Sequence, residues 1–195
     1  MSRRLALPFA TLFALSLQAH GAPMNKPDIK LNPHPKMRYE ITMTVEGAPG
    51  PFEKIEGHVD YHVSNPNSVP LTPFSGATVE PQADAPLTFE HVGGNVYKAF
   101  FYADRFLDED YFGQGVCRWS VVGASASLVH GPVRFSPTIM HKDIFERGSV
   151  KRWFANGDYR DAKVNRIEIG ADTRNAYKKP DETFSITLKA TEMSP

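Results

Sequence analysis

The sequence of 195 residues has one cysteine and no net charge, and it lacks an apolar run long enough to span a membrane. A single cysteine cannot form an internal disulfide, which excludes a disulfide-stapled mini-protein. The 22 basic side chains balance 22 acidic ones, and this neutrality argues against a nucleic-acid-binding protein. With 41% hydrophobic and 23% charged residues, the composition is that of a globular protein and excludes a disordered chain.

The N-terminal segment has the pattern of a secretory signal peptide. Arg3 and Arg4 give a basic start, residues 5–17 are mostly apolar, and small residues ending at Gly21 form a cleavage site. The apolar stretch is shorter than the roughly 20 residues of a membrane-spanning helix, and no cysteine at the cleavage site could carry a lipid anchor. We therefore predict a periplasmic protein without a membrane anchor. Its expected parts are a signal peptide over 1–21, an extended proline-rich lead-in over 22–35 and one domain over 36–195.

Apolar and polar residues alternate in most of the remaining chain. Residues 37–46 alternate strictly, and turn signals at 93–95 and 131–132 separate further alternating stretches. This pattern is typical of strands that bury one face, with Trp119 expected on the buried face beside Cys117. Only residues 142–147 suggest a helix. We expect an all-β protein, an antiparallel β-sandwich of about eight strands with at most one short helix.

Two groups of residues have side chains that could bind metal ions. His58, Asp60 and His62 share one face of an expected strand, but the two histidines are about 13 Å apart along it. The alternative is a polar, solvated face. The stretch from Asp104 to Asp110 has the oxygen ligands that calcium prefers, without the spacing of an EF-hand loop. We predict no metal and no cofactor, with a plain solvated loop at the second group.

Catalytic signatures are weak throughout. The sequence around Ser125 departs from the G-x-S-x-G nucleophile elbow at its last position and lies in a strand pattern. Cys117 alternates with apolar residues, which is typical of a buried structural thiol rather than a nucleophile. We therefore predict that the protein is not an enzyme.

Two aromatic-rich stretches of opposite charge are the candidate binding loops. Aromatic residues and arginine are enriched at the centres of protein interfaces, and a charged rim steers association. The predicted partner-binding residues are Asp108, Glu109, Asp110, Tyr111 and Phe112 in the acidic stretch, and Lys151, Arg152, Trp153, Tyr159 and Arg160 in the basic one.

Three stretches carry a resemblance to a known group of proteins: residues 39–45 (YEITMTV), 47–52 (GAPGPF) and 108–119 (DEDYFGQGVCRW). They resemble small exported proteobacterial proteins, some of which are similar to periplasmic immunity proteins that protect against secreted antibacterial effectors. Members of that group often carry a lipobox cysteine and a second cysteine near residues 65–70. This chain has neither, so the resemblance implies neither a lipid anchor nor a disulfide here.

We therefore predict a non-enzymatic periplasmic module that binds a protein partner, such as a secreted toxin or lipase that it neutralises as an immunity protein, and that binds no nucleic acid. The alternative is a C2-like β-sandwich that binds calcium or a lipid headgroup. A third hypothesis is a hydrolase of unrecognised type.

Overall fold

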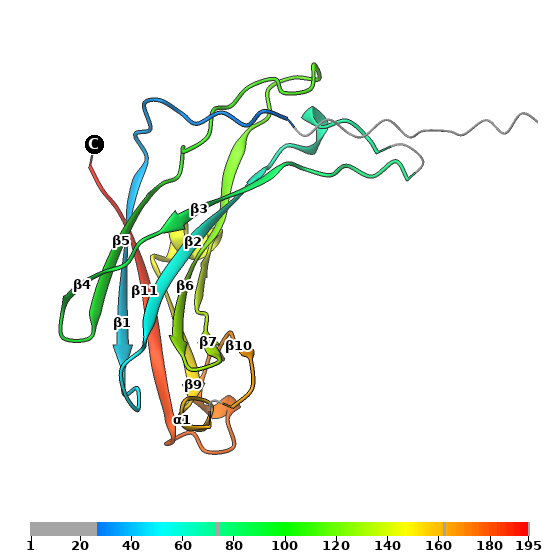
Figure 1. The fold of residues 1–195 in the computed structure, drawn as a ribbon. Coiled ribbons are helices and arrows are strands. Elements are labelled where there is room, and N and C mark those ends of the chain that lie inside the picture. The colour runs from blue at the N-terminus through cyan, green and yellow to red at the C-terminus, as the bar shows by residue number, and fades with distance from the viewer. Residues whose placement is uncertain (1–26, 73–74, 162, 195) are drawn as a thin grey trace, which may run out of the picture.

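A computed structural model describes residues 27–72, 75–161 and 163–194. The predicted signal peptide therefore lies outside the described residues. The protein is all-β, with 49% of residues in strands and 11% in helices, and its strands form two sheets. Figure 1 shows the two sheets side by side, in an elongated molecule. None of the helices in the described part of the chain has the length and apolarity needed to cross a membrane.

The first sheet is antiparallel and has five strands in the order β4-β5-β1-β11-β9. Its centre is β1, which pairs with β5 on one side and with β11 on the other. The strict alternation expected at residues 37–46 is present in β1. Its apolar residues at every second position form one buried face. The strands are β1 (Arg38–Glu46), β4 (Glu90–Gly93), β5 (Val96–Tyr102), β9 (Ser149–Ala155) and β11 (Thr183–Glu192).

The second sheet has six strands. Five follow the order β10-β7-β6-β2-β3, and β8 pairs with β6 beyond the end of β7. The pairing is antiparallel except between β10 and β7, which run parallel. The strands are β2 (Lys54–Val63), β3 (Gln82–Leu87), β6 (Trp119–His130), β7 (Val133–Phe135), β8 (Thr138–Met140) and β10 (Arg166–Glu168).

The core lies between the two sheets. Ile41 and Met43 of β1 and Val59 of β2 are fully buried in it. At one end, the rings of Phe135, Phe154 and Phe184 pack with centroids 5.3–5.5 Å apart. Cys117 is free and buried, so the described fold is held by packing and hydrogen bonds.

The sandwich fold is confirmed, with eleven strands rather than about eight. Strand β6 runs without a break from Trp119 to His130, and β9 lies where a basic binding loop was expected. The alternation in β9 is weak because two basic residues, Lys151 and Arg152, follow one another. In β3 it is weakened by polar residues and by Pro86. A π-helical turn, η2 (Asp143–Arg147), forms where a helix was expected, and η1 (Pro66–Ser68), α1 (Asn156–Arg160) and η3 (Arg174–Ala176) are further short helices.

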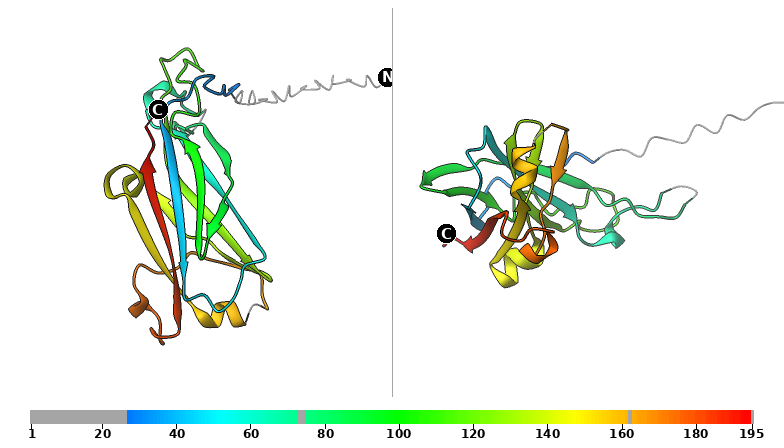
Figure 2. Two further views of the ribbon diagram at one scale, coloured as in Figure 1. Left: turned by 90° about the vertical axis from the view of Figure 1, so that its left-hand side faces the viewer. Right: turned by 90° about the horizontal axis from the view of Figure 1, so that it is seen from below.

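The two ends of the sandwich carry different structures. In Figures 1 and 2 the connection from β5 to β6 and the lead-in before β1 lie at the upper end, near the C-terminus. Helix α1 and the segment before β11 lie at the lower end. The two ends therefore present separate surfaces.

Candidate functional site

The acidic stretch forms a braced connection between β5 and β6. Asp104 accepts backbone hydrogen bonds from Lys36 at 2.8 Å and from Met37 at 2.9 Å, which ties the lead-in to this connection. Asn32 adds a bond from its side-chain amide to the carbonyl of Asp104, at 2.9 Å. The lead-in is therefore part of the folded domain from at least residue 32 onward.

The remaining carboxylates of the stretch are also engaged. Asp108 accepts a hydrogen bond from the backbone N–H of Trp119 at 2.9 Å, and Glu109 pairs with Lys30 at 2.8 Å. Asp110 accepts hydrogen bonds from the backbone N–H groups of Phe112 and Gln114. Partial burial opposes ionisation of Asp110, but several backbone N–H groups outweigh it and hold its pKa below the ordinary value.

These bonds bear on the calcium hypothesis. Each acidic side chain of the connection faces a different backbone or lysine donor, so the oxygens do not converge on one point. Within the described residues, no group of three or more His, Cys, Asp or Glu side chains could hold a metal ion. The charge of the stretch instead stabilises the conformation of the connection.

A pocket of about 590 Å³ opens at this end of the molecule. Its walls come from the lead-in, from the β5–β6 connection, from the start of β6 and from the β8–η2 segment. Three aromatic rings line it together with two carboxylates, and its lining includes no lysine or arginine. The lining residues that the argument uses are Asp104, Phe106, Asp108, Trp119, His141 and Phe145.

The Trp119 ring lines the pocket. It packs on Phe106 with centroids 4.9 Å apart and meets the edge of Tyr111 at 6.5 Å. It also packs against a small second core formed by Cys117 and its neighbours. The indole N–H is buried, and no acceptor for it is found in the described part of the chain. Trp119 is thus half-buried, between the core and the pocket.

His141 supplies a polar group to the pocket lining. Its Nδ1 lies 2.9 Å from the carbonyl oxygen of Val121. Because a carbonyl oxygen can only accept, Nδ1 carries the hydrogen, and the Nε2 of the neutral ring is left as an acceptor. The ring packs on Phe145 with centroids 4.6 Å apart.

The predicted acidic binding residues divide into two kinds. Asp108 lines the pocket, whereas Tyr111 and Phe112 pack partly against the small second core and support the connection from within. The Tyr111 hydroxyl donates to the carbonyl of Leu107 at 2.7 Å. The aromatic walls of the pocket were not among the predicted binding residues, because they come from three separate stretches of the sequence.

The predicted basic binding residues lie elsewhere. Lys151, Arg152 and Trp153 belong to strand β9, not to a loop, and Arg152 pairs with Asp172. The Lys151 ammonium lies 5.0 Å from the Trp153 ring centroid and 2.8 Å from Glu46.

The structure also corrects the role of Tyr159. This residue is 6% exposed and stacks on His130 with ring centroids 3.8 Å apart, so it is a core residue and not a surface anchor. Arg160 is exposed at the end of α1. Because α1 lies at the lower end, the acidic and basic stretches do not form one site.

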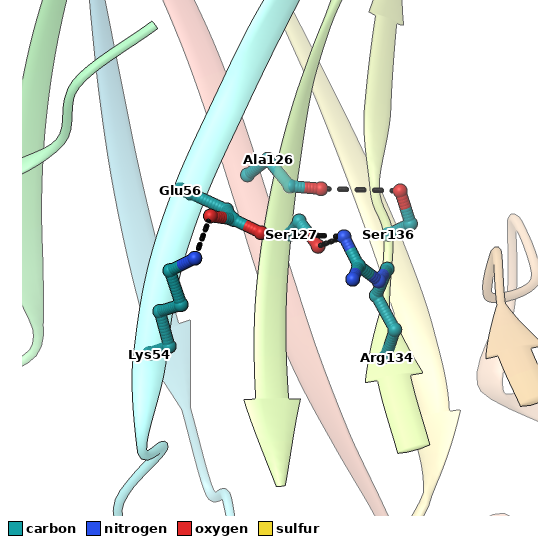
Figure 3. A network of polar contacts seen from close by, with 6 residues as sticks. All are labelled: Lys54, Glu56, Ala126, Ser127, Arg134 and Ser136. Carbon is teal, nitrogen blue, oxygen red and sulfur yellow. Dashed lines mark hydrogen bonds and ion pairs between the residues drawn. The ribbon is translucent and has the colours of Figure 1, made fainter. Parts of the chain in front are cut away.

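The outer face of the second sheet carries a separate polar network. As Figure 3 shows, Glu56 lies between Lys54 and Arg134, and the Arg134 guanidinium donates to the Ser127 hydroxyl at 3.0 Å. Ser136 bonds to the Ala126 carbonyl at 3.2 Å. These groups satisfy one another, and the network holds β2, β6 and β7 together.

The histidine pair expected on β2 lies on the same outer face. His58 Nε2 is 3.3 Å from Asp60, and both side chains are about half exposed. His62 also lies on the solvent side of β2, in line with its alternation with buried Tyr61 and Val63. Among the described residues, no group of three or more potential metal ligands includes these side chains.

Comparisons with known proteins find no matching family model, no matching curated protein and no matching solved structure.

Proposed function

We propose that this protein is a non-enzymatic, exported binding module that takes a basic side chain of a protein partner into the pocket beside Trp119. The observation that carries the proposal is the pocket lining, in which three aromatic rings and two carboxylates occur without a lysine or arginine. A lysine or arginine side chain needs apolar contact along its stem and negative charge or an aromatic face near its head. The pocket offers both.

The braced β5–β6 connection supports this role. Binding costs less when the site is already ordered, because no further loop ordering has to accompany association. The bonds from Asp104 to Lys36 and Met37 and from Asp108 to Trp119 hold the pocket walls in place before any partner arrives. The pocket therefore has the preorganisation of a specific recognition site.

Exposed aliphatic side chains occur on the lead-in and on the β5–β6 connection, two of the segments that form the pocket. Leu31 is 58% exposed, Met37 is 45% exposed and Val116 is 46% exposed. Leu31 forms a β-bridge with Phe106, and Met37 lines the pocket itself. Apolar contacts near a charged anchor are what a protein interface requires, whereas a free amine would use only the pocket. An immunity protein that neutralises a secreted toxin or lipase fits this arrangement.

Two other hypotheses have less support. A C2-like calcium site would have to displace the bonds that brace the acidic connection. A serine hydrolase would need an accessible nucleophile, but Ser125 is 6% exposed and its hydroxyl lies 2.8 Å from that of Thr138. We therefore retain protein binding as the proposed function.

The pocket proposal can be tested by NMR, because the protein has only two tryptophans. The two indole N–H signals are assigned with a Trp153→Phe variant. N-acetyl-arginine amide is titrated in, and N-acetyl-citrulline amide, which is neutral and of nearly equal shape, serves as the matched ligand. We expect the arginine ligand to shift the Trp119 signal and the citrulline ligand to shift it at least about tenfold more weakly. Equal shifts, or no shift of the Trp119 signal, would contradict a cation-binding pocket.

The partner can then be sought by pull-down from envelope and secreted fractions. Asp108→Asn removes the charge while its amide oxygen can still accept the Trp119 N–H. We expect it to weaken partner binding about tenfold and to reduce the dependence of the association rate on salt. Asp84→Asn on the outer side of β3 is the control and should bind as the wild type does. If Asp108→Asn also binds as the wild type does, Asp108 does not contribute to the interface.

Export is proposed from the sequence pattern and has its own test. Mass spectrometry of the protein from the periplasmic fraction should give a chain that starts at or near Ala22 and carries no acyl group. A chain that retains Arg3 and Arg4, or a lipidated one, would contradict this part of the proposal.

A further inference from the structure

Strand β10 concentrates exposed aliphatic side chains. Among the large hydrophobic residues of the described chain, the three most exposed are Val164 at 66%, Ile167 at 66% and Ile169 at 71%. They lie within six residues of one another, on or beside a strand at the end of the second sheet. Clustered exposed apolar side chains of this kind mark an interaction surface more often than singly scattered ones do.

The backbone of β10 has one open edge. Arg166 donates to the Pro132 carbonyl at 3.4 Å, and the Glu168 carbonyl accepts from Ser136 at 2.7 Å, so both residues bond toward the β7 side. Because backbone groups of successive strand residues point to opposite edges, the N–H and C=O of Ile167 face away from β7. No strand within the described ranges pairs with β10 on that side.

We propose that a second copy of this chain pairs with the open edge of β10, antiparallel, about a two-fold axis at Ile167. Ile167 of each copy would then donate its N–H to the other copy's Ile167 carbonyl, which uses the backbone groups that are free in one chain. The same register places Arg166 of one copy opposite Glu168 of the other, twice. Within one chain Arg166 already contacts Glu168 at 2.7 Å and Asp158 at 2.9 Å, so the contacts across the axis would extend this ion network. The segment Arg166-Ile167-Glu168 is thus complementary to itself, as a closed two-fold interface requires.

Two other sheet edges, β3 and β9, are less suited to such pairing. Strand β3 carries Asp84 and Pro86, and a charge and a proline are devices that keep an edge strand unpaired. On β9, Trp153 already exchanges two backbone hydrogen bonds with Ala171. Figure 1 shows β10 at the outer side of the second sheet, beyond β7. Pairing there would join the second sheets of two copies into one continuous sheet.

The expected dimer is weak, because three paired residues and a few aliphatic side chains bury less than about 1,200 Å², the range of transient complexes. Sedimentation velocity between roughly 5 and 500 μM should show a monomer at the low end and a rising dimer fraction at the high end, typical of a micromolar Kd. A monomer at every concentration would overturn the proposal.

The register is tested by Ile167→Pro and by a matched pair of apolar changes. Ile167→Pro removes a backbone N–H that faces solvent in the monomer and replaces an exposed side chain with a ring that tolerates extended backbone at a sheet edge. The fold should therefore persist while dimerisation weakens at least about tenfold. Ile167→Glu should have the same effect. Leu71→Glu changes a side chain of equal exposure, 65%, at another place and should leave the dimer intact. A dimer that survives Ile167→Pro would show that another surface is used.

A charge swap separates pairing from a general loss of fold. Arg166→Glu and Glu168→Arg each place like charges opposite one another in their own homodimers, and each also breaks the pair between residues 166 and 168 within its own chain. A mixture of the two variants restores both opposite-charge pairs in the heterodimer. We expect each variant alone to dimerise at least about tenfold more weakly and the mixture to recover dimer, with circular dichroism confirming that each variant is folded. Failure of the mixture to recover dimer would exclude this register.

Discussion

At the scale of single residues, Gly170 shows how the backbone limits the choice of side chain. Its φ of +73° lies in the left-handed region, and a Cβ there would be 2.8 Å from the Phe154 ring and 2.9 Å from the Trp153 carbonyl. Both neighbours are fixed, because Phe154 is 1% exposed and Trp153 is in a backbone bridge with Ala171. A glycine is therefore needed for two independent reasons.

We predict that Gly170→Ala lowers the free energy of unfolding by about 2 to 4 kcal/mol, from left-handed strain plus overpacking. Gly113→Ala is the matched control, because its φ is +72° and no atom lies within 4 Å of the added Cβ. It should cost only about 1 kcal/mol. Urea denaturation of both variants measures the difference, and equal losses would show that the contact with Phe154 relaxes freely.

Trp119 connects the core to the pocket, so its removal should affect both. Trp119→Ala should lower the free energy of unfolding by about 3 kcal/mol, the lower end of the range for a core aromatic residue, because part of the ring faces the pocket. Denaturant melting gives the value. A loss below about 1 kcal/mol would mean that the ring contributes little packing, contrary to its contacts with Phe106 and the small second core.

At the scale of elements, the fold depends on how irregular segments are attached to the sheets. The lead-in runs along the β5–β6 connection through a β-bridge between Leu31 and Phe106 and through the bonds to Asp104. A charged acceptor with two backbone donors is among the stronger hydrogen-bonding arrangements in proteins. Asp104 therefore holds the lead-in against the domain and shapes one wall of the pocket.

We predict that Asp104→Ala releases the lead-in without unfolding the sheets. Amide hydrogen exchange over residues 30–37 should become at least about tenfold faster, which corresponds to about 1.4 kcal/mol or more of lost local protection. Exchange in β1 and β11 should stay unchanged. Asp84→Ala serves as the control, since Asp84 is an exposed residue of β3. Unchanged exchange in the lead-in would mean that the bridge at Leu31 suffices.

At the scale of the whole molecule, acidic side chains paired across strands link stability to pH. Burial raises the pKa of Glu40, but hydrogen bonds from Lys98 and Thr42 together outweigh it, and the pKa lies below the ordinary value of 4.5. The same direction holds for Glu46, which is paired with Lys151 of β9. Because the folded-state pKa values are lowered, this stabilisation is present above about pH 4.5 and is lost as the pH falls through the folded-state values.

We therefore predict a melting temperature that is level from about pH 6 to 5 and falls steadily below about pH 4.5. Glu40→Gln should lower the melting temperature at pH 6 and flatten the fall in acid, because the titrating group is gone. Asp181→Asn on the exposed turn before β11 is the control and should leave the curve unchanged. Thermal melts followed by circular dichroism between pH 3 and 7 measure both. Parallel curves for wild type and Glu40→Gln would show that Glu40 does not contribute.

The alternation of apolar and polar residues by itself predicted the fold class and the buried faces of β1 and β2. A period of two places every second side chain of β1 and β2 on one face whatever the neighbouring strands are. It could not determine β3, β8 and β9, because short or edge strands bury too little to need a clean pattern. Asp108 was predicted from the sequence as a binding residue, and its role in binding stays a prediction.

Only the tertiary structure decided where the candidate site lies and what it contains. The pocket walls come from Asn32, from Asp104 to Asp108, from Trp119 and from His141 to Phe145. These stretches meet because β5 and β6 belong to different sheets and their connection has to cross the end of the sandwich, where the lead-in and η2 also lie. The same topology places α1 at the other end and keeps the two charged stretches apart. Contacts between such distant stretches depend on strand order. Strand order is set by long-range packing and produces no periodic pattern in the sequence.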